Sequence, residues 1–288
     1  MKHRAWEMFP CPAFPFRTSA FGASLFFWSA ESNHVQFESK MVDKHLCPLY
    51  SERAKPPWGA SLRKDVVQVY QMTQLFDLTH SAAGAYLAGL EYPWQALAQI
   101  KDWIAAIGHG LGEDYVQVEP EVWVHRTAVI APTAYLGAGC IIGPGTQVRH
   151  GAFIRGSALV GEGCVVGNSV ELKNVILFDR VQVPHFNYVG DSILGYCAHM
   201  GAGAVTSNVK SDKTPVAVKE GDAVIQTGLK KFGAMVGDHV EVGCNSVLNP
   251  GTIIGRNSQI YPTSCVRGVV PADSIWKTGG IVVKKEQR

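Results

Sequence analysis

The sequence has little excess charge of either sign and little sustained hydrophobicity. Its 288 residues carry a net charge of +2 at neutral pH, which leaves no excess of positive charge with which to hold nucleic acid. The apolar stretch at residues 20–30 is too short to cross a bilayer. These features exclude nucleic acid and membrane as partners, and we expect a soluble protein of one or two domains.

The spacing of the cysteines does not indicate a disulfide framework or a metal site. There are seven, an odd number, and no pair has the Cys-x-x-Cys spacing of a metal or redox motif. We therefore expect reduced thiols and a cytoplasmic location. The basic residues Lys2, His3 and Arg4 ahead of the apolar stretch are also compatible with a signal peptide, and this alternative stays open.

What the sequence has is a six-residue period of aliphatic residues. They are Val124, Ile130, Leu136, Ile142, Val148, Ile154, Val160, Val166 and Leu172, and then Val236, Val242, Leu248, Ile254, Ile260 and Val266. An amphipathic helix repeats about every 3.6 residues and a half-buried strand every two, so neither accounts for this period. A parallel β-helix accounts for it, because three hexapeptides make a triangular coil of about 18 residues with the aliphatic residue inside.

The period divides the chain into three parts. Residues 1–71 show no period and are expected to be a poorly ordered extension. Residues 72–120 are expected to form a helical hairpin, with helices over residues 81–90 and from 93 to about 111, that covers the open first coil. Residues 121–288 are expected to form the mainly β, single-stranded β-helix. Its period is lost at about 206–233, where we expect a protruding loop that is either functional or merely tolerated.

Two basic residues stand one coil apart. Arg155 follows the inward Ile154 and Lys173 follows the inward Leu172, so the two cations should lie on one face about 4.8 Å apart. Like charges at this separation repel, and an anion between them, such as a sugar phosphate, would hold them together. The alternative is that Glu171 and water neutralise the pair without a ligand.

A break in the period follows, because the aliphatic step resumes at Val183 and not at position 184. Irregularities in a β-scaffold often re-aim a side chain near a site. The side chain here is His185, twelve residues after Lys173. An unperturbed imidazole has a pKa of about 6.5, suitable for accepting a proton from an attacking amine. The alternative is a structural histidine.

Three runs of residues resemble one known family. They are Gly-Asn-Ser-Val-Glu-Leu-Lys at 167–173, Pro-His-Phe-Asn-Tyr-Val-Gly-Asp at 184–191, and Gly-Ala-Gly at 201–203 with Asn208 five residues on. They resemble the acetyltransferase domain of the bifunctional N-acetylglucosamine-1-phosphate uridyltransferase and glucosamine-1-phosphate acetyltransferase, over about residues 122–270. The resemblance implies a left-handed coil, acetyl-CoA as co-substrate, and a homotrimer with its sites between neighbouring subunits.

The resemblance also implies roles for individual residues. His185 matches the family's general base. The implied substrate contacts are Arg155, Lys173, Tyr188, His199 and Asn208. The implied contacts to acetyl-CoA are Ala202, Gly243 and Tyr261. His199 departs from the family, which usually has Asn there. The Gly-rich loop of the family's nucleotidyltransferase domain is missing, so we expect no pyrophosphorylase activity.

These features favour acetyl-CoA-dependent N-acetylation of an amino-sugar phosphate, and glucosamine 1-phosphate is the leading candidate for the substrate. The amine attacks the thioester directly, and the reaction requires no metal. One alternative is a non-catalytic scaffold that binds sugar phosphates or sugar nucleotides. Another is a zinc-dependent hydratase on a similar β-helix, which needs three converging histidines, and the coils contain no His-x4-His pair.

Overall fold

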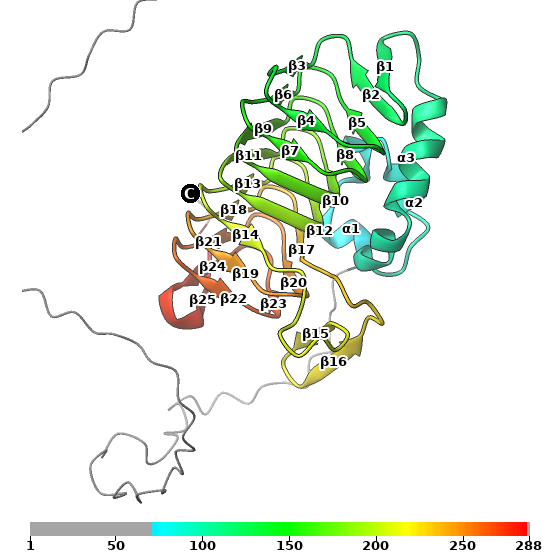
Figure 1. Ribbon diagram of the computed structural model, residues 1–288. Coiled ribbons are helices and arrows are strands. Elements are labelled where there is room, and N and C mark those ends of the chain that lie inside the picture. The colour runs from blue at the N-terminus through cyan, green and yellow to red at the C-terminus, as the bar shows by residue number, and fades with distance from the viewer. Residues whose placement is uncertain (1–70, 287–288) are drawn as a thin grey trace, which may run out of the picture. The chain divides into compact units, whose positions relative to one another are not determined.

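A parallel β-helix makes up most of the structure (Figure 1). The computed structural model describes residues 71–286, so the extension predicted for residues 1–71 lies outside the described part except for its last residue. Neighbouring coils pair in parallel with partners 17 or 18 residues apart over the regular stretches, as in Val122 with Cys140 and Leu172 with Val189. The predicted fold class, a left-handed parallel β-helix built from hexapeptides, is confirmed.

Each coil has three faces, and the strands of one face lie above one another. The first face consists of β2 (Val122–His125), β5 (Cys140–Ile142), β8 (Ala158–Val160), the second halves of β10 (Glu171–Leu177) and β12 (Tyr188–Leu194), β17 (Ala234–Val236), β20 (Thr252–Ile254) and β23 (Val269–Val270). The second face consists of β3 (Val129–Ile130), β6 (Gln147–Val148), β9 (Val165–Asn168), β11 (Gln182–His185), β13 (His199–Met200), β18 (Glu241–Val242), β21 (Gln259–Ile260) and β24 (Ser274–Lys277). The third face consists of β4 (Tyr135–Leu136), β7 (Phe153–Ile154), the first halves of β10 and β12, β14 (Val205–Thr206), β19 (Val247–Leu248) and β22 (Cys265–Val266).

The six-residue period marks the interior of the coils. Every aliphatic position that was predicted to point inward is buried except Ile130 and Leu136, which are partly exposed. These two belong to the first coil, on which no further coil stacks. Corner glycines allow the coils to approach closely, and a Cβ on Gly143 would lie 2.5 Å from the backbone of Gly161. The apolar column therefore forms as the sequence predicts.

The break in the period is a coil that is one residue shorter than its neighbours. Val166 pairs with Val183, and the two stand 17 residues apart in the sequence. Phe178 is fully buried within this coil. The step resumes at Val183 as predicted, and this register places His185 at the end of β11.

Short helical segments precede the β-helix. They are α1 (Met72–Leu75), α2 (Gly84–Leu87) and α3 (Ile100–His109), with 3-10 turns at Leu78–His80 and Pro93–Ala98. The helix predicted over residues 81–90 is reduced to α2, and the longer predicted helix begins as a 3-10 turn at Pro93. The prediction that a helical hairpin covers the open first coil is wrong, since on the first face the strand that pairs with this coil from outside is β1 (Tyr115–Glu119). The segments lie along the first face, with α3 packed against β5, β8 and β10 (Figure 1).

A second apolar row explains this placement. Its members precede the inward residues of the first face, and they are Trp123, Ile141, Leu159, Ile176, Ile193, Met235, Ile253 and Val269. Side chains alternate along a strand, so this row points out of the coil, and yet all of its members except the partly buried Val269 are buried. The helical segments remove this apolar surface from water, which stabilises them on the side of the β-helix.

Other elements occupy the ends and interrupt the coils. Strand β1 (Tyr115–Glu119) pairs antiparallel with β2 on the first coil, and β25 (Ile281–Lys284) pairs antiparallel with β24 on the last. The chain leaves the third face after β14, forms a hairpin of β15 (Ala217–Glu220) and β16 (Ala223–Gln226), and returns at β17. Among residues 71–286, no helix is both long and apolar enough to span a bilayer.

Candidate functional site

The corner at which the third face turns into the first carries the two predicted cations. Ile154 pairs with Leu172, so Arg155 and Lys173, which follow them, lie on consecutive coils as predicted. Lys173 pairs in turn with Gly190 of the next coil. We call this column of residues, which begins with Arg155, Lys173 and Gly190, the lysine corner.

Each cation of the lysine corner has its own carboxylate. Arg155 Nη1 lies 2.8 Å from Glu171 Oε1, and Lys173 Nζ lies 2.8 Å from Asp191 Oδ1. The bond from Glu171 raises the pKa of Arg155, which keeps the guanidinium charged. The two cations therefore do not depend, as the sequence suggested, on a ligand's anion to hold them together, because protein carboxylates already neutralise them. The alternative from the sequence was that Glu171 neutralises the pair, and the structure shows Glu171 paired with Arg155.

Asp191 is the centre of a hydrogen-bond network that the sequence did not reveal. Its side chain is 4% exposed and accepts hydrogen bonds from Lys173 Nζ at 2.8 Å, from Asn174 Nδ2 at 2.9 Å and from Asn208 Nδ2. Asn208 Nδ2 also donates to the Tyr188 hydroxyl at 3.1 Å. One buried carboxylate thus brings together three predicted substrate contacts, Lys173, Tyr188 and Asn208.

The Tyr188 hydroxyl lies across the strand that carries the lysine corner. A Cβ on Gly190 would lie 2.3 Å from the Tyr188 oxygen, so glycine is required there for the ring to lie flat over the backbone. Burial, and then the charge of Asp191, raise the pKa of Tyr188. The hydroxyl therefore stays protonated at neutral pH and can donate a hydrogen bond to a ligand oxygen.

His185 lies at a different corner, where the second face turns into the third. Its imidazole is exposed, and its backbone is fixed from both sides. His185 O accepts from Gly203 N at 3.0 Å, and His185 N donates to Asn187 Oδ1 at 3.1 Å. The buried Asn187 amide donates to Gly201 O and Ala204 O of the next coil.

The residues implied to contact acetyl-CoA share the corner of His185. Met200 pairs with Val242 and Val242 with Ile260, so Gly201, Gly243 and Tyr261 stand one above another, with Ala202 one residue past that register. Tyr261 is 42% exposed. We call the column of His185, Ala202, Gly243 and Tyr261 the histidine corner.

The two corners are separated within one chain. Gly190, the partner of Lys173, lies five residues after His185, and the turn at Phe186 and the first half of β12 separate the two. The third face lies between the corners. The position of His185 twelve residues after Lys173 therefore does not bring the imidazole to the basic pair within a single subunit.

His199 belongs to neither corner. It lies on the outer surface of the second face, where it pairs with Gln182, and its Nδ1 lies 2.8 Å from Glu241 Oε2. Arg180 and Cys197 line a shallow hollow with these residues. The Glu241 partner was not foreseen, because it follows the insertion and stands 42 residues from His199 in the sequence.

Comparisons with known proteins find similarity over the coils of the β-helix. The GMPPB C-terminal domain family matches residues 144–270. The resemblance inferred from the sequence, to the acetyltransferase region of the bifunctional GlmU-type proteins, is confirmed.

Two of the curated relatives are GlmU proteins from species of Methanococcus. The chain is 34% identical over 122 residues to the bifunctional protein GlmU of Methanococcus aeolicus, a stretch that covers 42% of this chain and 29% of the relative. It is 30% identical over 206 residues to GlmU of a Methanococcus maripaludis strain, covering 70% of this chain and 50% of the relative. The chain therefore spans at most half the length of these curated relatives. The solved acetyltransferase domain of PglB from Neisseria gonorrhoeae is 15% identical over 62% of this chain and 63% of that one, with a TM-score of 0.31.

Proposed function

We propose that this protein transfers the acetyl group of acetyl-CoA to the amino group of a sugar phosphate. The leading candidate for this sugar phosphate is glucosamine 1-phosphate. The observation that carries the proposal is the Asp191 network, which holds the Lys173 ammonium, the Tyr188 hydroxyl and the Asn208 amide at one corner. Cationic and neutral donors held together in this way suit a phosphate and the hydroxyl groups of a sugar. The similarity to GlmU-type proteins supports the same chemistry.

His185 acts as the general base in this proposal. The substrate amine attacks the thioester carbonyl, a carbon–nitrogen bond forms, and the imidazole accepts the proton that the nitrogen loses. The carbon–sulfur bond then breaks, and the proton passes to the CoA thiolate. Exposure of the imidazole at the histidine corner supports this role, because a substrate can reach it there.

Ala202 supplies the oxyanion donor. Of the amides near the thioester position, Gly203 N donates to His185 O and Ala204 N donates to Gly201 O. Ala202 N–H forms no hydrogen bond with any residue in the described part of the chain, so it is free to donate to the oxygen of the tetrahedral intermediate. Its position one coil from His185 supports this assignment.

A homotrimer completes the site. In this arrangement the histidine corner of one subunit faces the lysine corner of its neighbour, which brings His185 to the substrate that Lys173 holds. The outer third face supports such a contact, because Tyr135 and Phe153 are 59% and 43% exposed there with ring centroids 5.5 Å apart. Paired exposed aromatic residues are typical of surfaces that another chain covers.

Thiol release distinguishes the enzyme from a binding scaffold. We expect free CoA thiol to accumulate when the protein is given acetyl-CoA and glucosamine 1-phosphate, and not when the sugar phosphate is omitted. Glucose 1-phosphate, which lacks the amine, is the matched control and should give no release. Binding of glucosamine 1-phosphate without thiol release would support the scaffold and contradict the proposal.

A further inference from the structure

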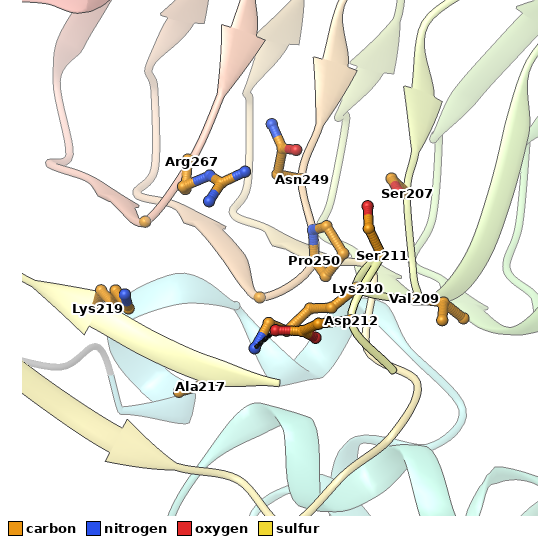
Figure 2. A pocket seen from close by; sticks show the side chains of 12 residues that line it. Ser207, Val209, Lys210, Ser211, Asp212, Ala217, Lys219, Asn249, Pro250 and Arg267 are labelled. Carbon is orange, nitrogen blue, oxygen red and sulfur yellow. Dashed lines mark ion pairs between the residues drawn. The ribbon is translucent and has the colours of Figure 1, made fainter. Parts of the chain in front are cut away.

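A second basic pocket lies between the lysine corner and the β15–β16 hairpin (Figure 2). Its volume is about 320 Å³. The residues that matter here are Ser207, Lys210, Ser211, Lys219, Asn249 and Arg267. None of them was singled out from the sequence as a ligand contact. We call this cavity the hairpin pocket.

The hairpin pocket continues the lysine corner. Thr206 pairs with Leu248 and Leu248 with Val266, so Ser207, Asn249 and Arg267, which follow them, extend the column of Arg155 and Lys173. Lys173 and Arg267 are four coils apart, which is about 19 Å at the usual strand spacing. Asn208 of the Asp191 network directly follows Ser207 in the chain. The pocket and the proposed sugar site therefore share one wall.

The pocket holds positive charge that no protein group neutralises. Lys219 and Arg267 are exposed and form no ion pair with any residue between 71 and 286. Lys210 is different, because its Nζ lies 3.3 Å from Asp212 Oδ2. At the other end of the column, Glu171 and Asp191 neutralise the cations. Two unpaired cations thus remain in the pocket.

Neutral donors and a fixed wall complete the pocket. Among the described residues, the hydroxyls of Ser207 and Ser211 have no hydrogen-bond partner. The hairpin packs closely on the corner, since a Cβ on Gly251 would lie 2.7 Å from the Val216 side chain and one on Gly268 would lie 2.9 Å from Lys219 O. Both glycines have positive φ, 79° and 80°. Close packing at two glycines fixes the backbone that carries Lys219 beside Arg267.

We propose that the hairpin pocket binds the phosphate groups of a nucleotide ligand. This inference rests on the proposed function and adds a second anion site to it. The single phosphate of a sugar 1-phosphate at Lys173 does not reach Arg267, about 19 Å away. In CoA the pantetheine arm places the diphosphate and the 3′-phosphate far from the thioester. In a nucleoside diphosphate sugar the two phosphates adjoin the sugar, so this ligand fills the pocket only if its sugar lies away from Lys173. Both ligands offer the same phosphate chemistry, and the test distinguishes them.

The proposal is tested by measuring ligand binding to a variant in which the two unpaired cations of the pocket are replaced by neutral residues. The variant is Lys219→Gln with Arg267→Gln, and the matched control is Lys101→Gln with Lys284→Gln, which removes the same charge from exposed residues elsewhere. Calorimetry at low salt measures the Kd for acetyl-CoA, 3′-dephospho-CoA, UDP-glucosamine and glucosamine 1-phosphate. We expect the pocket variant to bind one nucleotide ligand about tenfold or more weakly, because two charge-assisted contacts are lost. Glucosamine 1-phosphate should bind unchanged.

The four ligands separate the two sources. A loss for acetyl-CoA that is smaller for 3′-dephospho-CoA assigns the pocket to the 3′-phosphate, and an equal loss for both assigns it to the CoA diphosphate. A loss for UDP-glucosamine alone assigns it to the sugar nucleotide. Unchanged affinities for all nucleotides, a loss equal to that of the control, or no nucleotide binding by the unmodified protein overturns the proposal. Because the measurement needs no turnover, failure of acetyl transfer is a separate result.

Discussion

Replacement of His185 by alanine is expected to lower kcat for acetyl transfer by about 10²- to 10⁴-fold, the usual contribution of a positioned general base. The imidazole is exposed at the end of β11, so its removal leaves no cavity in the coil and the protein should remain folded. KM for glucosamine 1-phosphate should change little, since the sugar contacts lie at the lysine corner. Initial rates of thiol release over a range of substrate concentrations measure both effects.

A control variant identifies the role of His185. His125→Ala, at a partly exposed histidine that ends β2 and lies in neither corner, should keep the full rate. A His185→Ala variant with an unchanged rate would show that another group accepts the proton.

Replacement of Asp191 by asparagine is expected to weaken both the fold and the sugar site. Asparagine tolerates the positive φ of 47° at this position, so the backbone is kept. Its amide nitrogen, however, meets donors, because Lys173, Asn174 and Asn208 all donate to the aspartate. We expect a loss of about 2–3 kcal/mol in the free energy of unfolding, the cost of leaving buried donors unpaired. Urea unfolding measures it.

The kinetic effect of Asp191→Asn separates positioning from stability alone. Lys173 and Asn208 lose their common anchor, so KM for glucosamine 1-phosphate should rise about tenfold while KM for acetyl-CoA stays constant. Asp222→Asn, at an exposed position in the β15–β16 hairpin, is the control and should change neither. Equal losses toward both substrates, in proportion to the unfolded fraction, would mean that Asp191 is only structural.

The coils could be predicted from the sequence because each hexapeptide has one aliphatic residue at the same position, which identifies the residue that points inward. The placement of the helices could not be predicted from that column alone. It depends on the second apolar row, of which Ile141, Leu159 and Ile176 are part, and this row directly precedes the inward residues in the sequence. Two adjacent aliphatic residues on every strand of one face are a signal that this face is covered on the outside.

The candidate site was predictable where it depends on coil spacing and not where it depends on side-chain partners. The spacing placed Arg155 on the coil before Lys173, and Asp191, eighteen residues after Lys173, was open to the same argument. The twelve residues between Lys173 and His185 span two hexapeptides, which assigns them to different corners. The contact of His199 with Glu241 could not be predicted, because the insertion lies between them and their separation in the sequence is not one coil of 18 residues.

Complementation between two inactive variants tests the central claim, that the histidine corner and the lysine corner of neighbouring subunits form one acetyltransferase site. His185→Ala and Lys173→Ala are each expected to be nearly inactive when pure. Mixed trimers from co-expression of equal amounts should recover about a quarter of the unmodified rate of thiol release with glucosamine 1-phosphate, because one interface in four then has both intact residues. Activity no higher than the sum of the two pure variants would contradict the account.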